Sequence, residues 1–232
     1  DCKINDKILK SSLSIQLIST SERLGTSLLL WKEISNVIID DDVALNFTIN
    51  NQNSYLLLKE MGWKIEKTPI LINILHPFKL IYDFIRKKIS NRIVNRILEK
   101  IFLSLDYISS KFISLFHNKF DNVIAVNSFD ENYNDLLDIM NKSIIYGVNL
   151  NDKYMNWRYI KKPNNTYKIL SYVHDGRVIG YLIYETKKDF GTHIGYIMDI
   201  IADPNNKNVI NSLIHCAKKE LFQKGVTIIS AL

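Results

Sequence analysis

The sequence predicts an α/β (α+β) protein in which mixed, twisted sheets are flanked by helices. Short apolar runs of strand length alternate along the chain with longer segments in which apolar residues recur every three or four positions. A hairpin signal, Asp175-Gly176, separates two of the strand-like runs. Such an order of strands and helices is typical of sheets whose apolar faces are covered by helices.

The composition is that of a globular protein, with 232 residues, 47% of them apolar and 23% charged. This length is enough for one large or two small domains. The net charge of +6 accompanies an abundance of Ile, Asn and Lys along the whole chain. An A/T-rich coding sequence explains that excess, so we expect no nucleic-acid partner.

Cysteine usage and hydropathy bear on the compartment. The two cysteines, Cys2 and Cys216, form neither a disulfide framework nor a spacing suited to a metal, and we expect no metal site. A cytoplasmic location is therefore predicted. The chain has no run of about 18 apolar residues, so we expect no membrane span.

The ends of the chain predict that it is a piece of a longer protein. The first residue is Asp1 rather than Met, and a strand-like run at 226–232 stops abruptly. Whether the protein associates with itself is left open by the sequence.

The first part of the chain predicts strand, turn, helix, strand and helix in that order. Strands are expected at Leu13–Ile18 and Val43–Ile49, with a helix at Ser27–Val37 between them. A second helix is expected to begin in the Asn-rich stretch 50–53 and to end at Gly62.

A short turn precedes the first helix and contains Arg23, Leu24, Gly25, Thr26 and Ser27. The start of a helix exposes unpaired backbone N–H groups and the positive end of the helix dipole. Small residues let a phosphate approach that backbone closely. The turn is therefore a candidate phosphate site, and the alternative is an ordinary Ser/Thr cap on a surface helix.

The middle of the chain predicts an edge strand followed by amphipathic helix. Residues 63–75 are apolar and contain Pro69, which confines them to an edge strand or a strand broken at the proline. Phe78–Phe116 repeats apolar residues every three to four positions, with Lys and Arg between them. It is interpreted as one long or two shorter helices that connect the flanking domains, and a basic membrane-surface helix is the alternative.

From Asn118 onward the sequence predicts a second α/β unit. The predicted strands are Val123–Val126, Tyr167–His174, Arg177–Thr186, Thr192–Ala202 and Val226–Ala231. The predicted helices are Phe129–Lys142, Asp152–Ile160 and Asn206–Lys224.

Two motifs in the first part resemble the GNAT N-acetyltransferase family. The turn Glu22–Ser27 is similar to the family's turn of the type Arg/Gln-x-x-Gly-x-Gly/Ala, with Gly25 at the glycine and Ser27 at the small residue. The family's next signature is matched by a set of five residues. These are Asn51, Ser54, Leu57, Gly62 and Trp63. The segment 155–185 and the order of the second unit look like the second domain of tandem GNAT-like proteins of the polysaccharide-associated type.

The resemblance implies two incomplete GNAT-like units joined by a helical connector. The implied domains are 1–76, 77–117 and 118–232. It also implies acetyl-CoA as co-substrate and a small-molecule amine, with amino sugars as candidates, that attacks the thioester directly. The cofactor residues implied are Arg23, Leu24, Gly25, Thr26, Ser27, Asn51 and Ser54, and no catalytic acid or base is assigned.

Three residues of the second unit are candidates for the acceptor site. Trp157 and Arg158 stand together on a short predicted helix, although a Trp there is also explained as core. Asp199 lies among Ile and Met in a predicted strand, where a carboxylate needs partners. Its alternatives are a base for an amine or a hydrogen-bond acceptor for the backbone of a nearby loop.

Departures from the family pattern keep a second hypothesis open. Glu22 stands where the family usually has Arg or Gln, and Leu58 stands where many members have Tyr. In the second unit the corresponding turn has no Gly and contains Asp203, which would repel a pyrophosphate. The alternatives to an acyltransferase are therefore a catalytically inactive GNAT-like binding module and a basic membrane-peripheral protein.

Overall fold

The computed structural model describes residues 2–4, 7–9, 11–14, 33, 36, 45–48, 55, 58–60, 62–64, 68–114, 122–143, 146–189 and 191–231. By its internal contacts the chain forms two compact units. The first is Asp1–Lys67 with Ile139–Leu150, and the second is Thr68–Asp138 with Asn151–Leu232. This division falls at different residues from the domain boundaries 1–76, 77–117 and 118–232, which stay a prediction.

The first unit contains two small sheets. The strands β1 (Cys2–Ile4), β2 (Lys7–Leu9) and β7 (Tyr146–Val148) pair antiparallel in the order β2-β1-β7. The strands β3 (Ser11–Ser14) and β4 (Leu45–Thr48) pair parallel. A parallel pair needs a crossover of a dozen or more residues, and Glu33 and Asn36 within that connection are helical and exposed. The predicted strand–helix–strand order agrees with this arrangement.

A short helical stretch follows β4 and ends where the sequence predicts. Tyr55 and Leu58–Glu60 are helical, and Gly62 has a positive φ of 82°. The Trp63 N–H donates to the Leu58 carbonyl at 3.0 Å, which closes the last turn. The Leu58 side chain is buried, so at this position the chain presents a core residue.

The second unit is built on a six-stranded mixed sheet in the order β5-β11-β10-β9-β8-β6. Its strands are β5 (Leu71–Ile74), β6 (Val123–Val126), β8 (Lys168–His174), β9 (Arg177–Asp189), β10 (Thr192–Ala202) and β11 (Ile228–Ala231). Only the β10–β11 pair is parallel within this sheet. The predicted fold class is confirmed.

The helical segments after residue 75 lie where the sequence predicts helix. They are α3 (Pro77–Ile85), η1 (Arg86–Lys88), α4 (Arg92–Ser114), η2 (Glu131–Tyr133), α5 (Asn134–Ser143), α6 (Asp152–Met155), η3 (Asn156–Ile160) and α7 (Lys207–Gln223). The stretch predicted as one or two helices is thus two, α3 and α4. The η3 segment is a π-helix, which the apolar pattern does not distinguish from an α-helix.

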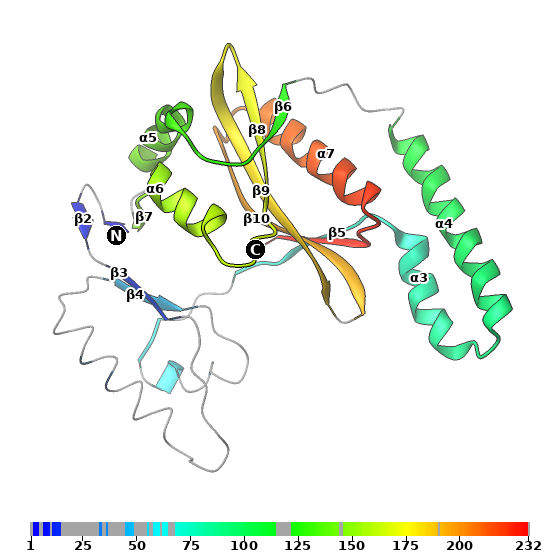
Figure 1. The fold of residues 1–232 in the computed structure, drawn as a ribbon. Coiled ribbons are helices and arrows are strands. Elements are labelled where there is room, and N and C mark those ends of the chain that lie inside the picture. Colours follow the sequence, from blue (N-terminus) through cyan, green and yellow to red (C-terminus); the bar gives the residue numbers. More distant parts are fainter. Residues whose placement is uncertain are drawn as a thin grey trace. The chain divides into compact units, whose positions relative to one another are not determined.

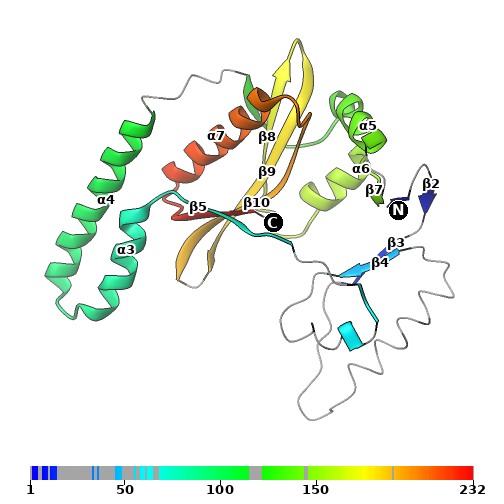
Figure 2. The same cartoon turned by 180° about the vertical axis from the view of Figure 1, so that it is seen from behind.

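Helices cover both faces of this sheet. Figures 1 and 2 show α7 on one side of the sheet and α6 on the other. Leu182 and Tyr184 of β9 pack against the buried side of α7, whereas Tyr181 and Ile183 face the opposite way, and all four side chains are fully buried. Gly180 is required where α7 begins, because a Cβ there would lie 2.6 Å from Val209 Cγ1.

β5 forms one edge of this sheet, with Leu71 opposite Ala231. Pro69 precedes the strand, as the prediction of an edge strand or a strand broken at the proline requires. β5 leads through His76 directly into α3.

The helices α3 and α4 form a hairpin held by one buried carboxylate. Asp106 of α4 is fully buried, and its two oxygens accept the backbone N–H groups of Phe78 at 3.0 Å and Lys79 at 2.8 Å. These are orphan donors of the α3 N-terminus, so Asp106 caps α3 across 27 residues of chain. His76 lies beside Asp106, with its Nδ1 3.5 Å from the carboxylate, and its Nε2 donates to the Phe222 carbonyl of α7.

Replacing Asp106 by Ala is expected to lower the free energy of unfolding by about 3 kcal/mol, because two backbone N–H groups lose their acceptor in a buried place. Urea unfolding followed by circular dichroism measures this change. Glu99→Ala, an exposed carboxylate on the same helix, is the control and is expected to change stability by less than about 0.5 kcal/mol. Equal losses in the two variants would contradict the assigned role of Asp106.

Candidate functional site

The most distinctive polar group of the second unit lies on the sheet face opposite α7. Asp199 of β10 accepts hydrogen bonds from the hydroxyls of Tyr159 in η3 and Tyr181 in β9, each with an O–O distance of 3.3 Å. We call these three residues the tyrosine–aspartate cluster. Tyr159 and Tyr181 are buried, whereas Asp199 is half-buried, so the carboxylate is the most exposed member of the cluster.

A β-bulge turns Asp199 toward this face. The register between β10 and β9 shifts between Ile197 and Asp199, so that Ile197 lies opposite Tyr184 while Asp199 lies opposite Ile183. Residues two apart on a regular strand share a face, and one extra residue on the bulged strand sends them to opposite faces. Ile197 therefore packs against the α7 side, and the carboxylate two positions later faces the tyrosines.

The environment of the cluster raises the pKa of all three side chains, so both tyrosines are neutral and Asp199 is the group that titrates. Burial raises the pKa of Asp199, and the hydrogen bonds from Tyr181 and Tyr159 together with the charge of Arg158 oppose that rise. Burial and the nearby Asp199 charge raise the pKa of both Tyr159 and Tyr181. Both hydroxyls therefore stay protonated at neutral pH and donate, which leaves Asp199 as the proton acceptor of the cluster.

Aromatic residues beneath the cluster hold Tyr181 in place. Phe129 and Tyr133 lie edge-on to the Tyr181 ring, with centroids 5.5 Å and 6.2 Å away. The Tyr133 hydroxyl is bonded to Ser171 of β8, which fixes the ring. Sequence analysis missed Tyr133, Tyr159, Tyr181 and Ser171, because their signal is only that they are polar residues in apolar runs.

The two other acceptor candidates, Trp157 and Arg158, lie on η3, the segment that also carries Tyr159. The Arg158 guanidinium donates to the Tyr154 hydroxyl at 2.8 Å and lies 5.2 Å from the Tyr159 ring centroid. The Trp157 side chain is 64% exposed, with its ring 5.8 Å from Tyr154. The alternative interpretation of Trp157 as a core residue is therefore wrong, because η3 points this ring to solvent.

The side-chain hydrogen-bond partners of Asp199 are tyrosine hydroxyls. The structure brings Arg158 within electrostatic range of Asp199, whose Oδ2 accepts both tyrosine hydroxyls and whose carboxylate also has a hydrogen bond from the Ile200 backbone. Trp157 and Arg158 are neighbours on the π-helix, with Tyr159 next in sequence. Arg158 thus lies near Asp199 and the tyrosines, whereas the ring contact of Trp157 is with Tyr154, and the roles of all three candidates stay a prediction.

The predicted cofactor residues Arg23, Leu24, Gly25, Thr26, Ser27, Asn51 and Ser54 lie outside the described residues. The strands on either side of that turn are described, and they are the parallel pair β3 and β4. Their pairing is the arrangement in which a turn after the first strand leads into a crossover helix.

The second unit repeats this strand–turn–helix order at β10 and α7, and there side chains of the turn itself accept backbone N–H groups. The Asp203 carboxylate accepts the Asn205 N–H at 2.8 Å, and the Asn206 side chain accepts the Val209 N–H. Acceptors from the chain itself thus cap this end, and the charge of Asp203 opposes an anion. This agrees with the expectation that the turn lacks affinity for a pyrophosphate.

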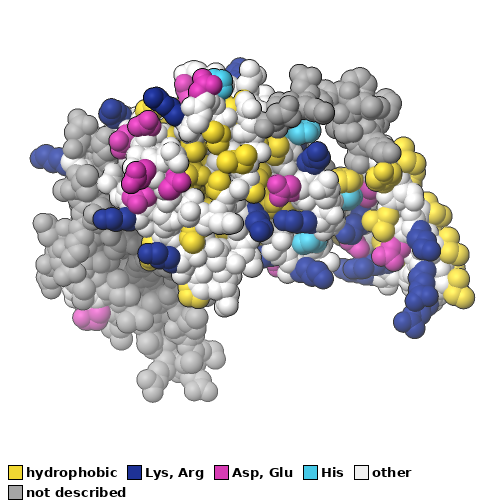
Figure 3. All heavy atoms as spheres, turned by 45° about the horizontal axis from the view of Figure 1, so that its top comes forward, with side chains coloured by type: hydrophobic (Ala, Val, Ile, Leu, Met, Phe, Trp, Pro, Cys, Tyr) yellow, Lys and Arg dark blue, Asp and Glu magenta, His cyan; other side chains and the backbone are white. Residues whose placement is uncertain are grey.

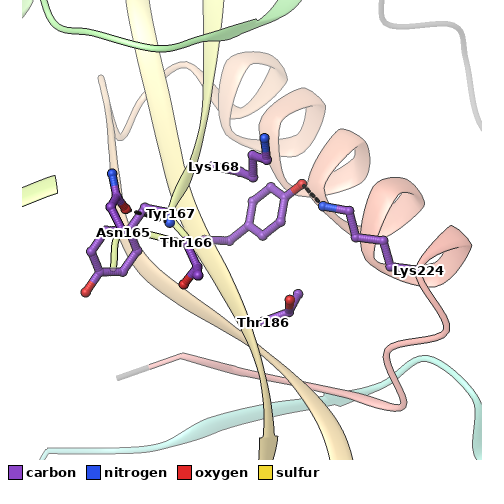
Figure 4. A pocket seen from close by; sticks show the side chains of 7 residues that line it. Asn165, Thr166, Tyr167, Lys168, Thr186 and Lys224 are labelled. Carbon is purple, nitrogen blue, oxygen red and sulfur yellow. Dashed lines mark hydrogen bonds between the residues drawn. The ribbon is translucent and has the colours of Figure 1, made fainter. Parts of the chain in front are cut away.

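A hollow of about 350 Å³ lies on the α7 side of the sheet (Figure 4). Its lining residues are Asn165, Thr166, Tyr167, Lys168, Tyr184, Thr186 and Lys224. Lys224 donates to the Tyr184 hydroxyl at 3.3 Å, and that hydroxyl donates to Glu220. Three polar groups at this hollow, on Lys224, Tyr184 and Glu220, thus satisfy one another.

The described residues contain no candidate metal-binding site. Nowhere in them do three or more His, Cys, Asp or Glu side chains gather as ligands for an ion. Cys216 is a free, half-buried thiol on α7.

Comparison with known proteins identifies the fold. The sequence matches no protein-family model and no curated protein. Among solved structures, a tandem GNAT protein from the clavulanic acid biosynthesis pathway matches with a TM-score of 0.50 and 10% identity, covering 95% of this chain and 66% of that one. This chain therefore spans about two thirds of the length of that protein.

Other acetyltransferases match a smaller part of the chain. The ribosomal-protein-alanine N-acetyltransferase of Brucella melitensis biovar Abortus 2308 has 14% identity and a TM-score of 0.38, covering 47% of this chain and 77% of its own. A predicted acetyltransferase of Clostridium acetobutylicum, solved with acetyl-CoA, has 15% identity and a TM-score of 0.34, covering 47% and 80%.

Replacing Asp199 by Asn tests the buried carboxyl through its pH dependence. A raised native pKa means that the native state holds its proton longer than the unfolded chain, so Asp199 makes stability fall as pH rises from about 4 to its native pKa. The Asn variant is expected to lack this loss, and its stability relative to the parent should grow across that window. Melting temperatures measured from pH 4 to pH 8 check this. Asp175→Asn, at an exposed turn, is the control, and a parallel pH profile for the parent and the Asp199 variant would contradict the assignment.

Proposed function

We propose that this chain, which has the fold of the GNAT acetyltransferases, moves an acetyl group from acetyl-CoA to a small-molecule amine, with amino sugars among the candidate acceptors. The observation that carries the proposal is the fold match to a tandem GNAT protein over 95% of the chain. Fold alone does not fix chemistry, so the residues of each unit must supply the rest.

In the first unit we assign the cofactor pyrophosphate to the turn Arg23–Ser27. A helix start with Gly25, Thr26 and Ser27 offers backbone N–H groups and little steric bulk to an anion. The parallel pair β3–β4, with helical residues in its crossover, supports a helix start at this place. Asn51 and Ser54 are assigned to further polar contacts with the same molecule.

In the second unit we assign the acceptor amine to Trp157, Arg158 and Asp199. An amine arrives protonated and attacks only after it has lost a proton, so a nearby carboxylate with a raised pKa is suited to take that proton. The exposed Trp157 ring offers a flat apolar surface on which a sugar ring packs.

The transfer itself needs no covalent enzyme intermediate. The neutral amine attacks the thioester carbonyl, the carbon–sulfur bond breaks, and coenzyme A leaves as a thiolate that then takes up a proton. Holding both reactants in position supplies a large part of the rate enhancement.

A catalytically inactive binding module is the second candidate. The buried Leu58 leaves no hydroxyl where a general acid is expected, and the capped start of α7 removes a second cofactor turn. Binding of acetyl-CoA without release of free thiol in the presence of any amine would favour this candidate.

Titration with acetyl-CoA tests the cofactor turn. The parent protein is expected to bind with a micromolar dissociation constant, and Gly25→Asp is expected to weaken binding by at least about tenfold, because a carboxylate then faces the pyrophosphate. Isothermal titration calorimetry measures both. Asn205→Asp, which adds the same charge to the corresponding exposed turn of the second unit, is the matched control.

The two variants separate the possible results. Loss of binding in Gly25→Asp with normal binding in Asn205→Asp supports the assignment to the first unit. Unchanged binding in Gly25→Asp, or no heat in the parent, would remove it.

Acceptor turnover tests the second unit. Trp157→Ala is expected to raise the KM for the acceptor about tenfold and to leave acetyl-CoA affinity unchanged, because it removes packing area for the acceptor alone. A thiol-release assay over a panel of amino sugars and simple amines gives the kinetic constants. Tyr107→Ala, a similarly exposed aromatic on α4, is the control, and a tenfold rise there too would argue against a specific role for Trp157.

A further inference from the structure

The loop end of the α3–α4 hairpin carries large apolar side chains that face solvent. Phe84 at the end of α3 is 68% exposed, and Ile93 at the start of α4 is 71% exposed. Further exposed apolar residues on the two helices are Ile81, Ile85, Val94, Ile97, Ile101, Leu105 and Ile108. Isolated exposed apolar residues are ordinary, whereas a continuous set of this size marks an interaction surface.

The α4 helix has three distinct faces. One packs against α3 through Phe102, whose ring lies 5.9 Å from Tyr82, and through Asp106. A second, with Ile93, Ile97 and Ile101 at four-residue spacing, is exposed and apolar. The third face is basic and consists of Arg92, Arg96 and Lys100, each one residue before an isoleucine of the apolar face.

The basic face and the apolar face are neighbours, since successive residues of a helix point about 100° apart. Figure 3 shows Lys and Arg side chains beside hydrophobic side chains at the right edge of the molecule, the side on which Figure 1 places the α3–α4 hairpin. The loop adds Arg86, Lys87 and Lys88, all exposed. Of these six cations only Arg86 has an ion pair within the described part of the chain, with Asp83 at 3.2 Å.

We propose that the α3–α4 hairpin docks on an anionic membrane surface, with its apolar face in the headgroup region and its basic face and loop against lipid phosphates. The proposal does not rest on acetyl transfer. The helices would lie at the surface, because none of the described helices has the length and apolar run needed to cross a bilayer.

Charge and composition favour lipid over a protein partner. Six exposed cations beside an apolar stripe, with Arg86 alone in an ion pair among the described residues, match a surface of like-signed lipid phosphates. Each Lys or Arg contributes about tenfold or less to partition. Protein interfaces are depleted in Lys and draw their binding energy from a few Trp, Tyr and Arg residues in pockets. The hairpin instead offers a convex row of Ile with Lys and Arg beside it.

The hairpin is anchored so that its loop end is free to dock. Asp106 and His76 hold the opposite end against α7, and the Lys79 ammonium donates to the Gly225 carbonyl at 2.9 Å. Figure 1 shows the loop between α3 and α4 at the end of the hairpin away from the sheet. The contacts that fix the hairpin therefore leave the apolar and basic faces uncovered by the rest of the second unit.

Vesicle co-sedimentation of the full chain tests the proposal. The protein is expected to sediment with phosphatidylcholine vesicles that contain about 30% phosphatidylserine and not with pure phosphatidylcholine, and about 1 M salt should release it. The triple variant Arg92→Gln, Arg96→Gln, Lys100→Gln should lower the partition coefficient about a hundredfold. The double variant Ile93→Gln, Ile97→Gln should lower it by at least about tenfold.

Ile124→Gln is the matched control, because Ile124 is an exposed Ile on β6 outside the hairpin. It should bind as the parent does. All the altered side chains are exposed, and circular dichroism melts confirm that each variant folds.

Insertion has a separate readout. Phe84→Trp places an indole at the loop end, and its fluorescence should shift to the blue and be quenched by lipids with brominated acyl chains. Absence of quenching with bound protein would overturn insertion of the apolar face.

Three other results would overturn the proposal. These are no sedimentation with either vesicle, equal sedimentation with neutral vesicles, and full binding by both the triple variant and the Ile93/Ile97 double variant. A dimer in sedimentation equilibrium that the Ile93 and Ile97 changes abolish, without any vesicle binding, would assign the face to a second copy of the chain.

Discussion

Burial of β9 on both faces is the constraint on which the second unit depends. Four successive side chains, Tyr181 to Tyr184, are fully buried, and on a strand these alternate between the two faces. A sheet with such a strand must be covered on both sides, and α7 and α6 with η3 do so. The two coverings differ in chemistry, since α7 supplies an apolar core whereas η3 brings Tyr159 and Arg158.

That difference explains why one carboxylate is acceptable inside the sheet. If β10 were regular, Asp199 would share a face with Ile197 and lie in the apolar core under α7, where a carboxylate has no donors. The bulge moves it to the face where two tyrosine hydroxyls can donate. The same move leaves it partly desolvated, which is the cause of its raised pKa. The bulge therefore explains both the hydrogen bonds from the two tyrosines and the raised pKa of Asp199.

The sequence predicts the local elements well and the long-range contacts poorly. The strands Val123–Val126 and Thr192–Ala202 have the predicted bounds, and Asp175 and Gly176 adopt the positive φ values that their hairpin turn requires. These follow from periodicity and turn chemistry within a few residues. The pairing of β5 with β11 and the cap that Asp106 gives to α3 join residues far apart, and no local pattern encodes them. The sequence also does not predict the bulge, because Met198, the extra residue between Ile197 and Asp199, is a residue type common in regular strands.

The α3–α4 hairpin and the tyrosine–aspartate cluster contact different parts of the second unit. The hairpin is fixed through His76 to Phe222, at the end of α7, whereas the cluster lies on the face that α7 does not cover. Substitutions on the exposed faces of α4 therefore leave the contacts of Asp199 unchanged, and substitutions at Asp199 leave those of Asp106 unchanged. Binding of the hairpin to an anionic surface would therefore require no change in the contacts of the cluster.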